Sequence, residues 1–161
     1  MNKKACFIGH RNIWNENLKI KLAQVVEQEI LTGTKHFTMG THGDFDKVAL
    51  NVCKDLRNRY KDIVIEVVII DLQQLKTIVK SDPILGIEKY IPYDDVETVI
   101  YDTEQCHYKA KIISSNKQMV DNCTTLICYV NENKFKSGAK LILKYAKRKG
   151  LKIINLFTNG I

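Results

Sequence analysis

The chain lacks the cysteine patterns of secreted and zinc-binding domains. Its five cysteines stand singly, with no CxxC pair and no regular spacing: Cys6, Cys53, Cys106, Cys123 and Cys128. Isolated cysteines indicate reduced thiols rather than a disulfide framework or a structural zinc. No spacing among the histidines, cysteines and acidic residues suggests a metal site. We therefore expect a cytoplasmic protein without disulfides or a bound metal.

Long hydrophobic runs are also lacking. The basic start of the chain is followed by an apolar run of only Ala5 to Ile8, which is too short for a signal peptide. No later segment approaches the roughly 20 apolar residues of a membrane span. The chain has 161 residues, of which 45% are hydrophobic and 27% charged, and this predicts one globular domain over residues 1–161.

Acidic residues are outnumbered, with 25 Lys and Arg against 18 Asp and Glu, which gives a net charge of +7. This balance favours phosphate-bearing partners, but it does not separate nucleotides from nucleic acids. The excess is greatest in a C-terminal basic zone, made of Lys134, Lys136, Lys140, Lys144, Lys147, Arg148, Lys149 and Lys152. A solvated helix face explains such a zone. Nucleic-acid binding is the alternative, although only Phe135 and Tyr145 could stack on bases there.

Short apolar runs alternate with segments of helical periodicity along the chain. Strands are predicted at residues 4–8, 36–39, 63–70, 96–101, 124–130 and 151–157, and helices at 15–32, 45–59, 104–122 and 138–149. Asn15 or Asn17 is expected to cap the first helix, and Gly33 and Gly150 suit the left-handed position after a helix. Residues 71–97 are expected to form short helix and loop. The alternation predicts right-handed βαβ crossovers and a parallel sheet covered on both faces.

Three turns that follow predicted strands are candidates for a ligand site, at residues 9–11, 40–46 and 131–138. Strand ends of a parallel sheet share one rim, so these turns should lie together. The glycines alone are a weak signal, because neither the GxGxxG fingerprint nor a Walker lysine is present.

The charged residues of these turns have alternative roles. Arg11 could clamp a phosphate or pair with a carboxylate on the rim, and His10 could donate or relay a proton. His42 could touch a phosphate or be solvated. Asp44 and Asp46 could bind ribose hydroxyls, act as a general base or cap the second helix. We favour capping for Asp46 and leave the role of Asp44 open.

Several motifs occur in one order over nearly the whole chain. They are FIGHR at 7–11, GTHGDFD at 40–46, NKQMVD at 116–121, SGA at 137–139, YAK at 145–147 and GLKIINL at 150–156. In these motifs the chain resembles the YpsA-like branch of the SLOG superfamily, the SMF/DprA and LOG group. The resemblance implies an α/β, Rossmann-like three-layer sandwich with a mostly parallel central sheet. It also implies that a nucleotide or a NAD or ADP-ribose relative binds at the strand-end rim, with contacts from Gly9, His10, Arg11, Gly40, Thr41, His42, Gly43, Asp44, Asn116, Met119, Ser137, Gly138 and Ala139.

The chain departs from the family where catalysis is concerned. LOG enzymes carry a PGGxGT turn followed by a glutamate, whereas this chain has Ser137-Gly138-Ala139 and no acidic residue after Glu132. Relatives also tend to have an Arg and a Trp where this chain has Ser115 and Gln118. We therefore expect a protein that senses or sequesters its ligand without catalysis and without a required cofactor, in stress signalling or phage–host conflict. The alternative is a nucleotide N-glycosidic hydrolase or transferase that uses Asp44 or Asp46, and a nucleic-acid-associated protein is a third. The relatives commonly assemble, so a homo-oligomer is expected, and no membrane partner is.

Overall fold

The computed structural model describes residues 3–13, 15–70, 80–81, 88–89, 95–101 and 107–157. A six-stranded sheet runs through the molecule in the order β6-β3-β2-β1-β7-β8, and every neighbouring pair in it is parallel. Its strands are β1 (Lys3–Gly9), β2 (Thr34–Met39), β3 (Val64–Ile69), β6 (Glu97–Ile100), β7 (Thr125–Tyr129) and β8 (Lys152–Asn155). The described helices are α1 (Leu18–Leu31), α2 (Asp44–Arg57), α4 (Tyr108–Asp121) and α5 (Gly138–Lys149). A short antiparallel pair, β4 (Lys80–Ser81) with β5 (Glu88–Lys89), stands apart from this sheet.

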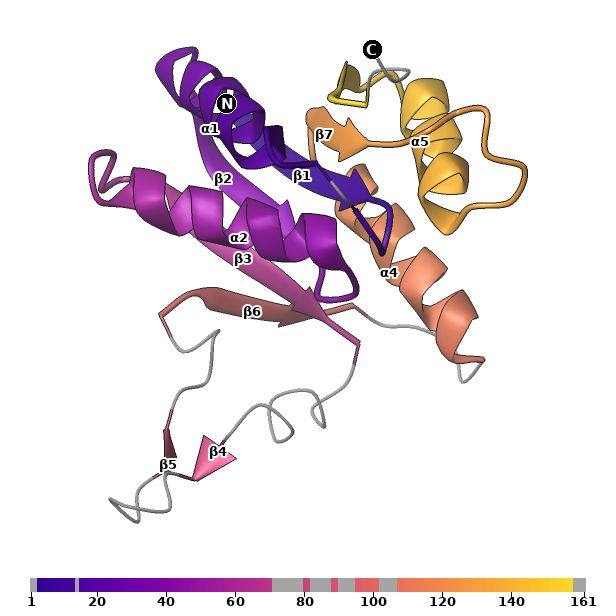
Figure 1. Cartoon of the computed structure of the whole chain (residues 1–161), viewed down its shortest axis with the longest axis horizontal. Coiled ribbons are helices and arrows are strands. Elements are labelled where there is room, and N and C mark those ends of the chain that lie inside the picture. Colours follow the sequence, from indigo (N-terminus) through magenta and orange to yellow (C-terminus); the bar gives the residue numbers. More distant parts are fainter. Residues whose placement is uncertain are drawn as a thin grey trace.

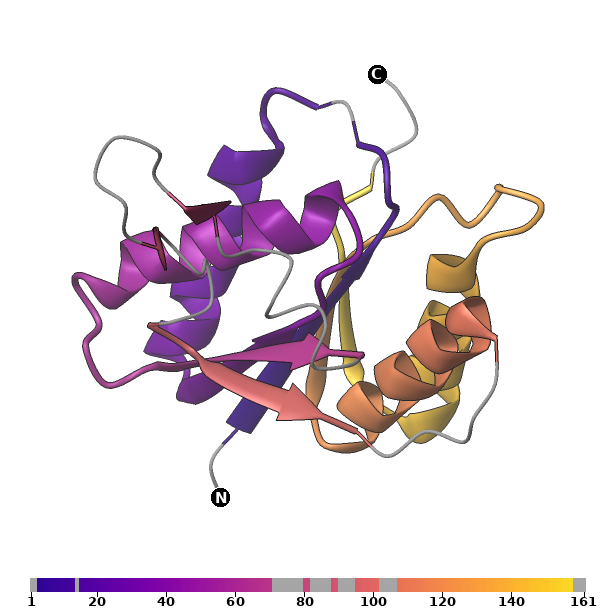
Figure 2. The same cartoon turned by 90° about the horizontal axis from the view of Figure 1, so that it is seen from below.

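Helices cover both faces of the sheet. Helices α1 and α2 lie on one face, and α4 and α5 lie on the other (Figures 1 and 2). Strand β1 supplies both layers, because Ala5 and Phe7 pack with α1 and α2 while Cys6 and Ile8 pack with α4 and α5. The predicted Rossmann-like three-layer sandwich is therefore confirmed.

The strand order reverses at β1. The chain proceeds from β1 to β2, β3 and β6 on one side, and then crosses to β7 and β8 on the other side. In an open α/β sheet the ligand crevice lies outside the carboxyl ends of the strands at such a reversal. The topology thus points to the ends of β1 and β7.

The ends of the elements follow the sequence signals closely. Gly33 and Gly150 have φ of 110° and 81°, as predicted for glycines that follow helices. Asn17 stands at the N-cap of α1, but its side chain makes no capping hydrogen bond, and its N–H donates to the Asn15 side chain instead. The expectation for residues 71–97 lies mostly outside the described residues. No helix among those described is long and apolar enough to cross a membrane.

A buried carboxylate connects α1 to the starts of β2 and β8. Glu29 of α1 is 3% exposed. Its carboxylate accepts hydrogen bonds from Lys152 Nζ at 2.7 Å and from Thr34 Oγ1 at 3.3 Å. This contact ties α1 to β2 and β8. The four cysteines within the described ranges are free and buried: Cys6, Cys53, Cys123 and Cys128.

Candidate functional site

A pocket of about 400 Å³ opens at the strand-order reversal. This volume lies at the small end of the range of about 300–1,000 Å³ for ligand pockets. All three predicted turns contribute to its walls, and α4 completes them. The lining residues are Ile8, Gly9, His10, Arg11, His42, Gly43, Asp46, Lys109, Ile112, Ile113, Asn116, Lys134, Ser137, Gly138 and Ala139.

Two glycines allow the first two turns to approach each other. A β-carbon on Gly43 would lie 2.7 Å from Cα of Arg11. At this contact the N–H of Asp44 donates to the carbonyl of Arg11 at 2.8 Å. A β-carbon on Gly9 would lie 2.3 Å from Cγ of Phe45, whose ring is fully buried. Both glycines are therefore required by close packing beneath the pocket.

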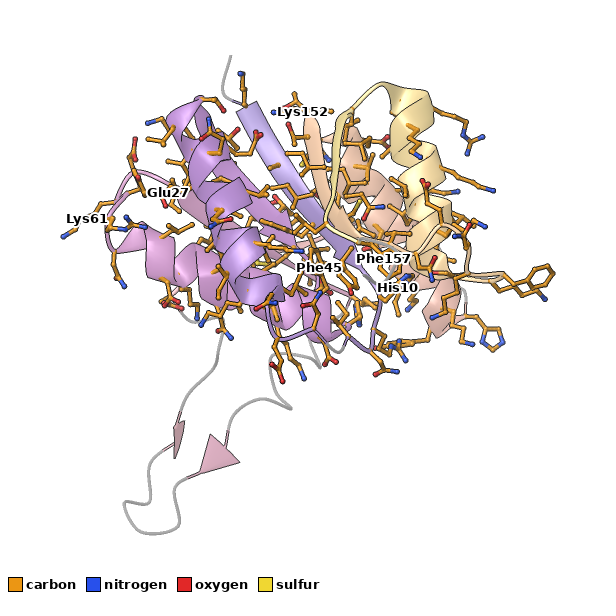
Figure 3. The ribbon with its side chains drawn as sticks, turned by 45° about the horizontal axis from the view of Figure 1, so that its top comes forward. His10, Glu27, Phe45, Lys61, Lys152 and Phe157 are labelled. Atoms are coloured by element: carbon orange, nitrogen blue, oxygen red, sulfur yellow. The ribbon has the colours of Figure 1, made fainter. Side chains whose placement is uncertain are left out.

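His10, in the turn after β1, contacts the loop between β7 and α5 through both of its ring nitrogens. Its Nε2 accepts a hydrogen bond from the N–H of Asn131 at 2.8 Å, and its Nδ1 lies 3.4 Å from Oγ of Ser137. One imidazole thus contacts both ends of the loop between β7 and α5. Figure 3 shows His10 on the same side of the molecule as Phe45 and Phe157.

These contacts determine the protonation of His10. A nitrogen that accepts from a backbone N–H carries no proton, so the neutral ring is protonated on Nδ1 and donates to Ser137. Burial lowers the pKa of His10, and the nearby charge of Lys134 lowers it further. Ser137 and His10 therefore resemble a nucleophile–base pair only in distance, because the nitrogen facing the hydroxyl already holds its proton.

His42 and Arg11 form another wall of the pocket. The His42 ring packs edge-on against Tyr108, with ring centroids 5.9 Å apart, and its Nδ1 lies 3.5 Å from the tyrosine hydroxyl. Burial lowers the pKa of His42, and the charge of Arg11 adds to this effect. Arg11 is exposed and forms no ion pair with a carboxylate of the described residues. Its guanidinium is thus available to an anion in the pocket.

The two aspartates of α2 have different environments. Both lie in the first turn of α2, but Gly43 occupies the N-cap and no side chain makes a capping hydrogen bond, so the capping role favoured for Asp46 is wrong. Asp44 is not among the lining residues, and its carboxylate accepts the N–H of Ile13 at 3.1 Å. Asp46 lines the pocket and accepts the N–H of His42 at 3.0 Å. Burial raises the pKa of Asp46 to about 6, although backbone N–H groups of His42 and Gly40 oppose the rise.

Some residues expected at the site do not line the pocket, and others were missed. The predicted contacts outside the lining are Gly40, Thr41, Asp44 and Met119, and Met119 is only 1% exposed in the core. The lining residues that were not predicted are Ile8, Lys109, Ile112, Ile113 and Lys134. Helical periodicity in the sequence could have identified the lining residues of α4, because positions 109, 112, 113 and 116 share one face of a helix.

The described lining of the pocket carries more positive than negative charge. Arg11, Lys109 and Lys134 line it, and Asp46 is the one carboxylate among the described lining residues. Helix α5 begins at the pocket, where Oγ of Ser137 caps it by accepting the N–H of Lys140 at 3.3 Å. Its first turn contains no acidic residue. The free N–H groups and dipole at such an end attract anions.

The C-terminal basic zone lies largely on the surface of α5 and is partly paired. Lys147 pairs with Glu132, and Lys149 pairs with Asp121. The hydroxyl of Tyr145 donates a hydrogen bond to Asp121 at 2.7 Å. The ring of Tyr145 makes cation–π contacts with Lys117, Arg148 and Lys149. These contacts are typical of a solvated helix face.

The fold and pocket define a Rossmann-like α/β domain with a pocket at the strand-order reversal whose described lining has more cations than carboxylates. No group of three or more metal-ligating side chains occurs within the described part of the chain. Comparison with family models and with curated proteins gave no match for this chain. The functional assignment therefore depends on the geometry of the pocket.

Proposed function

We propose that this pocket binds a phosphate-bearing, nucleotide-type small molecule and holds it without chemical turnover. The observation that carries the proposal is the convergence of three cationic side chains and the start of α5 on one pocket at the strand-order reversal. Charge-assisted hydrogen bonds to phosphate are among the stronger polar contacts in proteins. The resemblance to the YpsA-like branch of the SLOG superfamily favours the same ligand class. Such a protein would sense or sequester a signalling nucleotide.

The contacts of His10 and Asp46 support binding without turnover. The proton of His10 lies on the nitrogen that faces Ser137, so the histidine cannot activate that hydroxyl. Asp46 is engaged by backbone N–H groups of the preceding turn. No second carboxylate from the described residues lines the pocket to share acid–base work with it.

Calorimetric titration with AMP, ADP, NAD and ADP-ribose tests the proposal. We expect Arg11→Gln to weaken binding by about 10- to 150-fold, the equivalent of one hydrogen bond to a charged group, 1.5–3 kcal/mol. Lys61→Gln is the matched control, because Lys61 is an exposed cation at the far end of the molecule from His10 (Figure 3). Absence of binding to every ligand at about 1 mM would refute the proposal.

One observation favours a second candidate, an N-glycosidic hydrolase. Asp46 lines the pocket with a pKa raised to about 6, which is suitable for a general base near neutral pH. In this reaction Asp46 takes a proton from water, the water oxygen bonds to C1′ of the ribose, and the base leaves with the electrons of the C–N bond and takes up a proton.

Chromatography of incubated nucleotides decides between the candidates. Hydrolysis predicts free base and ribose phosphate, at a rate that rises through about pH 6 as Asp46 ionises and that Asp46→Asn abolishes. Intact nucleotide in the presence of demonstrated binding supports the non-catalytic function.

A further inference from the structure

Asn116 occupies a distinctive place in the pocket wall. It is half-buried on α4, one helical turn before Met119, which is 1% exposed in the core. Among the described residues, none forms a hydrogen bond with its amide, whereas the nearby Asn122 donates to the carbonyl of Gln118. An amide offers an acceptor beside two donors. Asn116 therefore brings to the pocket lining an amide for which the described part of the chain supplies no hydrogen-bond partner.

Apolar residues share the pocket lining with this amide. Ile112 and Ile113 precede Asn116 by about one turn, Ile8 comes from the end of β1, and Ala139 comes from α5. Ligand pockets commonly combine apolar walls with a few placed polar groups that orient the ligand. Apolar walls with an amide at one end suit a flat heteroaromatic ring that has a donor and an acceptor on one edge. Asparagine pairs with the edge of adenine in this way.

Cations lie elsewhere on the same walls. Lys109 stands in the first turn of α4, two turns before Asn116, and Lys134 belongs to the loop that leads into α5. The lining thus combines an amide and isoleucines on one face of α4 with cations and the start of α5. A nucleotide has the same division between its base and its phosphate.

We propose that Asn116, with Ile112 and Ile113, forms a nucleobase subsite for an adenine-type base, while the phosphate faces the cations. This inference rests on the proposed function and specifies its ligand. The volume of about 400 Å³ accommodates one nucleotide unit at the small end of ligand pockets. A sugar phosphate or an inorganic anion would leave the amide and the isoleucines without a role.

Titration of the full chain with AMP, GMP and ribose 5-phosphate tests the subsite. The wild-type protein should bind AMP more tightly than ribose 5-phosphate. Asn116→Leu should weaken AMP binding by roughly 5- to 150-fold, the range for an amide paired with a base edge, and should leave ribose 5-phosphate binding unchanged. Asn116→Asp should shift the preference from AMP toward GMP, because a carboxylate accepts from the two adjacent donors of guanine.

The matched control is Asn58→Asp, an exposed residue just beyond α2 with the same change of charge. It should alter none of the affinities. Equal binding of AMP and ribose 5-phosphate, or an unchanged base preference in Asn116→Asp, would overturn the subsite and leave the phosphate site standing. Failure of all three ligands to bind at about 1 mM would overturn the subsite, and absence of binding to ADP, NAD and ADP-ribose as well would overturn the proposed function. If Asn116→Leu does not fold, the preference of Asn116→Asp decides the matter.

Discussion

Replacing Gly9 by alanine should destabilise the protein strongly, because the site beneath the pocket has no space for a methyl group. The added β-carbon would lie 2.3 Å, 2.4 Å and 2.5 Å from three carbons of Phe45. Optimal carbon–carbon contacts are about 3.5–4.0 Å, so each distance is more than about 1 Å too short. One methyl group therefore collides with several atoms at once.

Phe45 cannot move aside easily. Its ring is fully buried, stacks on Tyr129 with centroids 6.3 Å apart and packs against Phe7 at 6.3 Å. Its backbone belongs to the first turn of α2, where the N–H of Asp44 donates a hydrogen bond to the carbonyl of Arg11. The strain must then be relieved by separating β1 from α2.

Overpacking of a core lowers the free energy of unfolding by about 1–3 kcal/mol. Because the added methyl group collides with three atoms, we expect a loss of about 3 kcal/mol for Gly9→Ala. For a chain of this size the melting temperature should fall by roughly 6–12 °C. Urea denaturation is the direct assay, with a lower midpoint and an unchanged slope.

Gly138→Ala is the control, since nothing lies within 4 Å of its added β-carbon. Gly138 begins α5, where alanine should leave stability unchanged or raise it by up to about 1 kcal/mol. Coincident denaturation curves for Gly9→Ala and the wild type would refute the reasoning, because β1 and α2 would then separate without cost.

Three further predictions concern polar groups. Lys152→Met leaves the buried carboxylate of Glu29 without its cation and should lower the free energy of unfolding, measured by urea denaturation, by about 1–3 kcal/mol. Adding Glu29→Gln to this variant should restore part of the lost stability. The pKa of Asp46 is raised in the folded protein, so its contribution to the free energy of unfolding is present below about pH 4 and is lost as the pH rises through about 6. Asp46→Asn should remove this loss of stability between about pH 4 and 6. Parallel profiles of stability against pH for Asp46→Asn and the wild type would contradict the prediction. The pKa of His10 is lowered, so its contribution is present above the unfolded value of about 6.5 and is lost as the pH falls through the lower folded value. Nitrogen NMR at pH 7 should show the proton of His10 on Nδ1, and a proton on Nε2 would contradict the hydrogen-bond assignment.

Local sequence patterns predicted much of the fold. Apolar runs such as Ala5–Ile8 specify buried strands because extended backbone inside a protein needs apolar side chains on both faces. Gly33 and Gly150 indicated where helices end, since glycine adopts positive φ without steric cost. The rule that parallel strands end at one rim predicts that His10, Gly43 and Ser137 lie near one another.

The roles of individual residues at the site depend on contacts that no local pattern contains. His10 and Asn131 are 121 positions apart, and their hydrogen bond determines which nitrogen holds the proton and removes Ser137 as a nucleophile. The raised pKa of Asp46 reflects its desolvation, which sequence spacing does not reveal. The sequence by itself determined the elements, their order and the turns that meet at the pocket. Only the tertiary structure decided that α4 forms a wall and that Arg11, Lys109 and Lys134 share it, because side-chain burial and charge depend on neighbours distant in the chain.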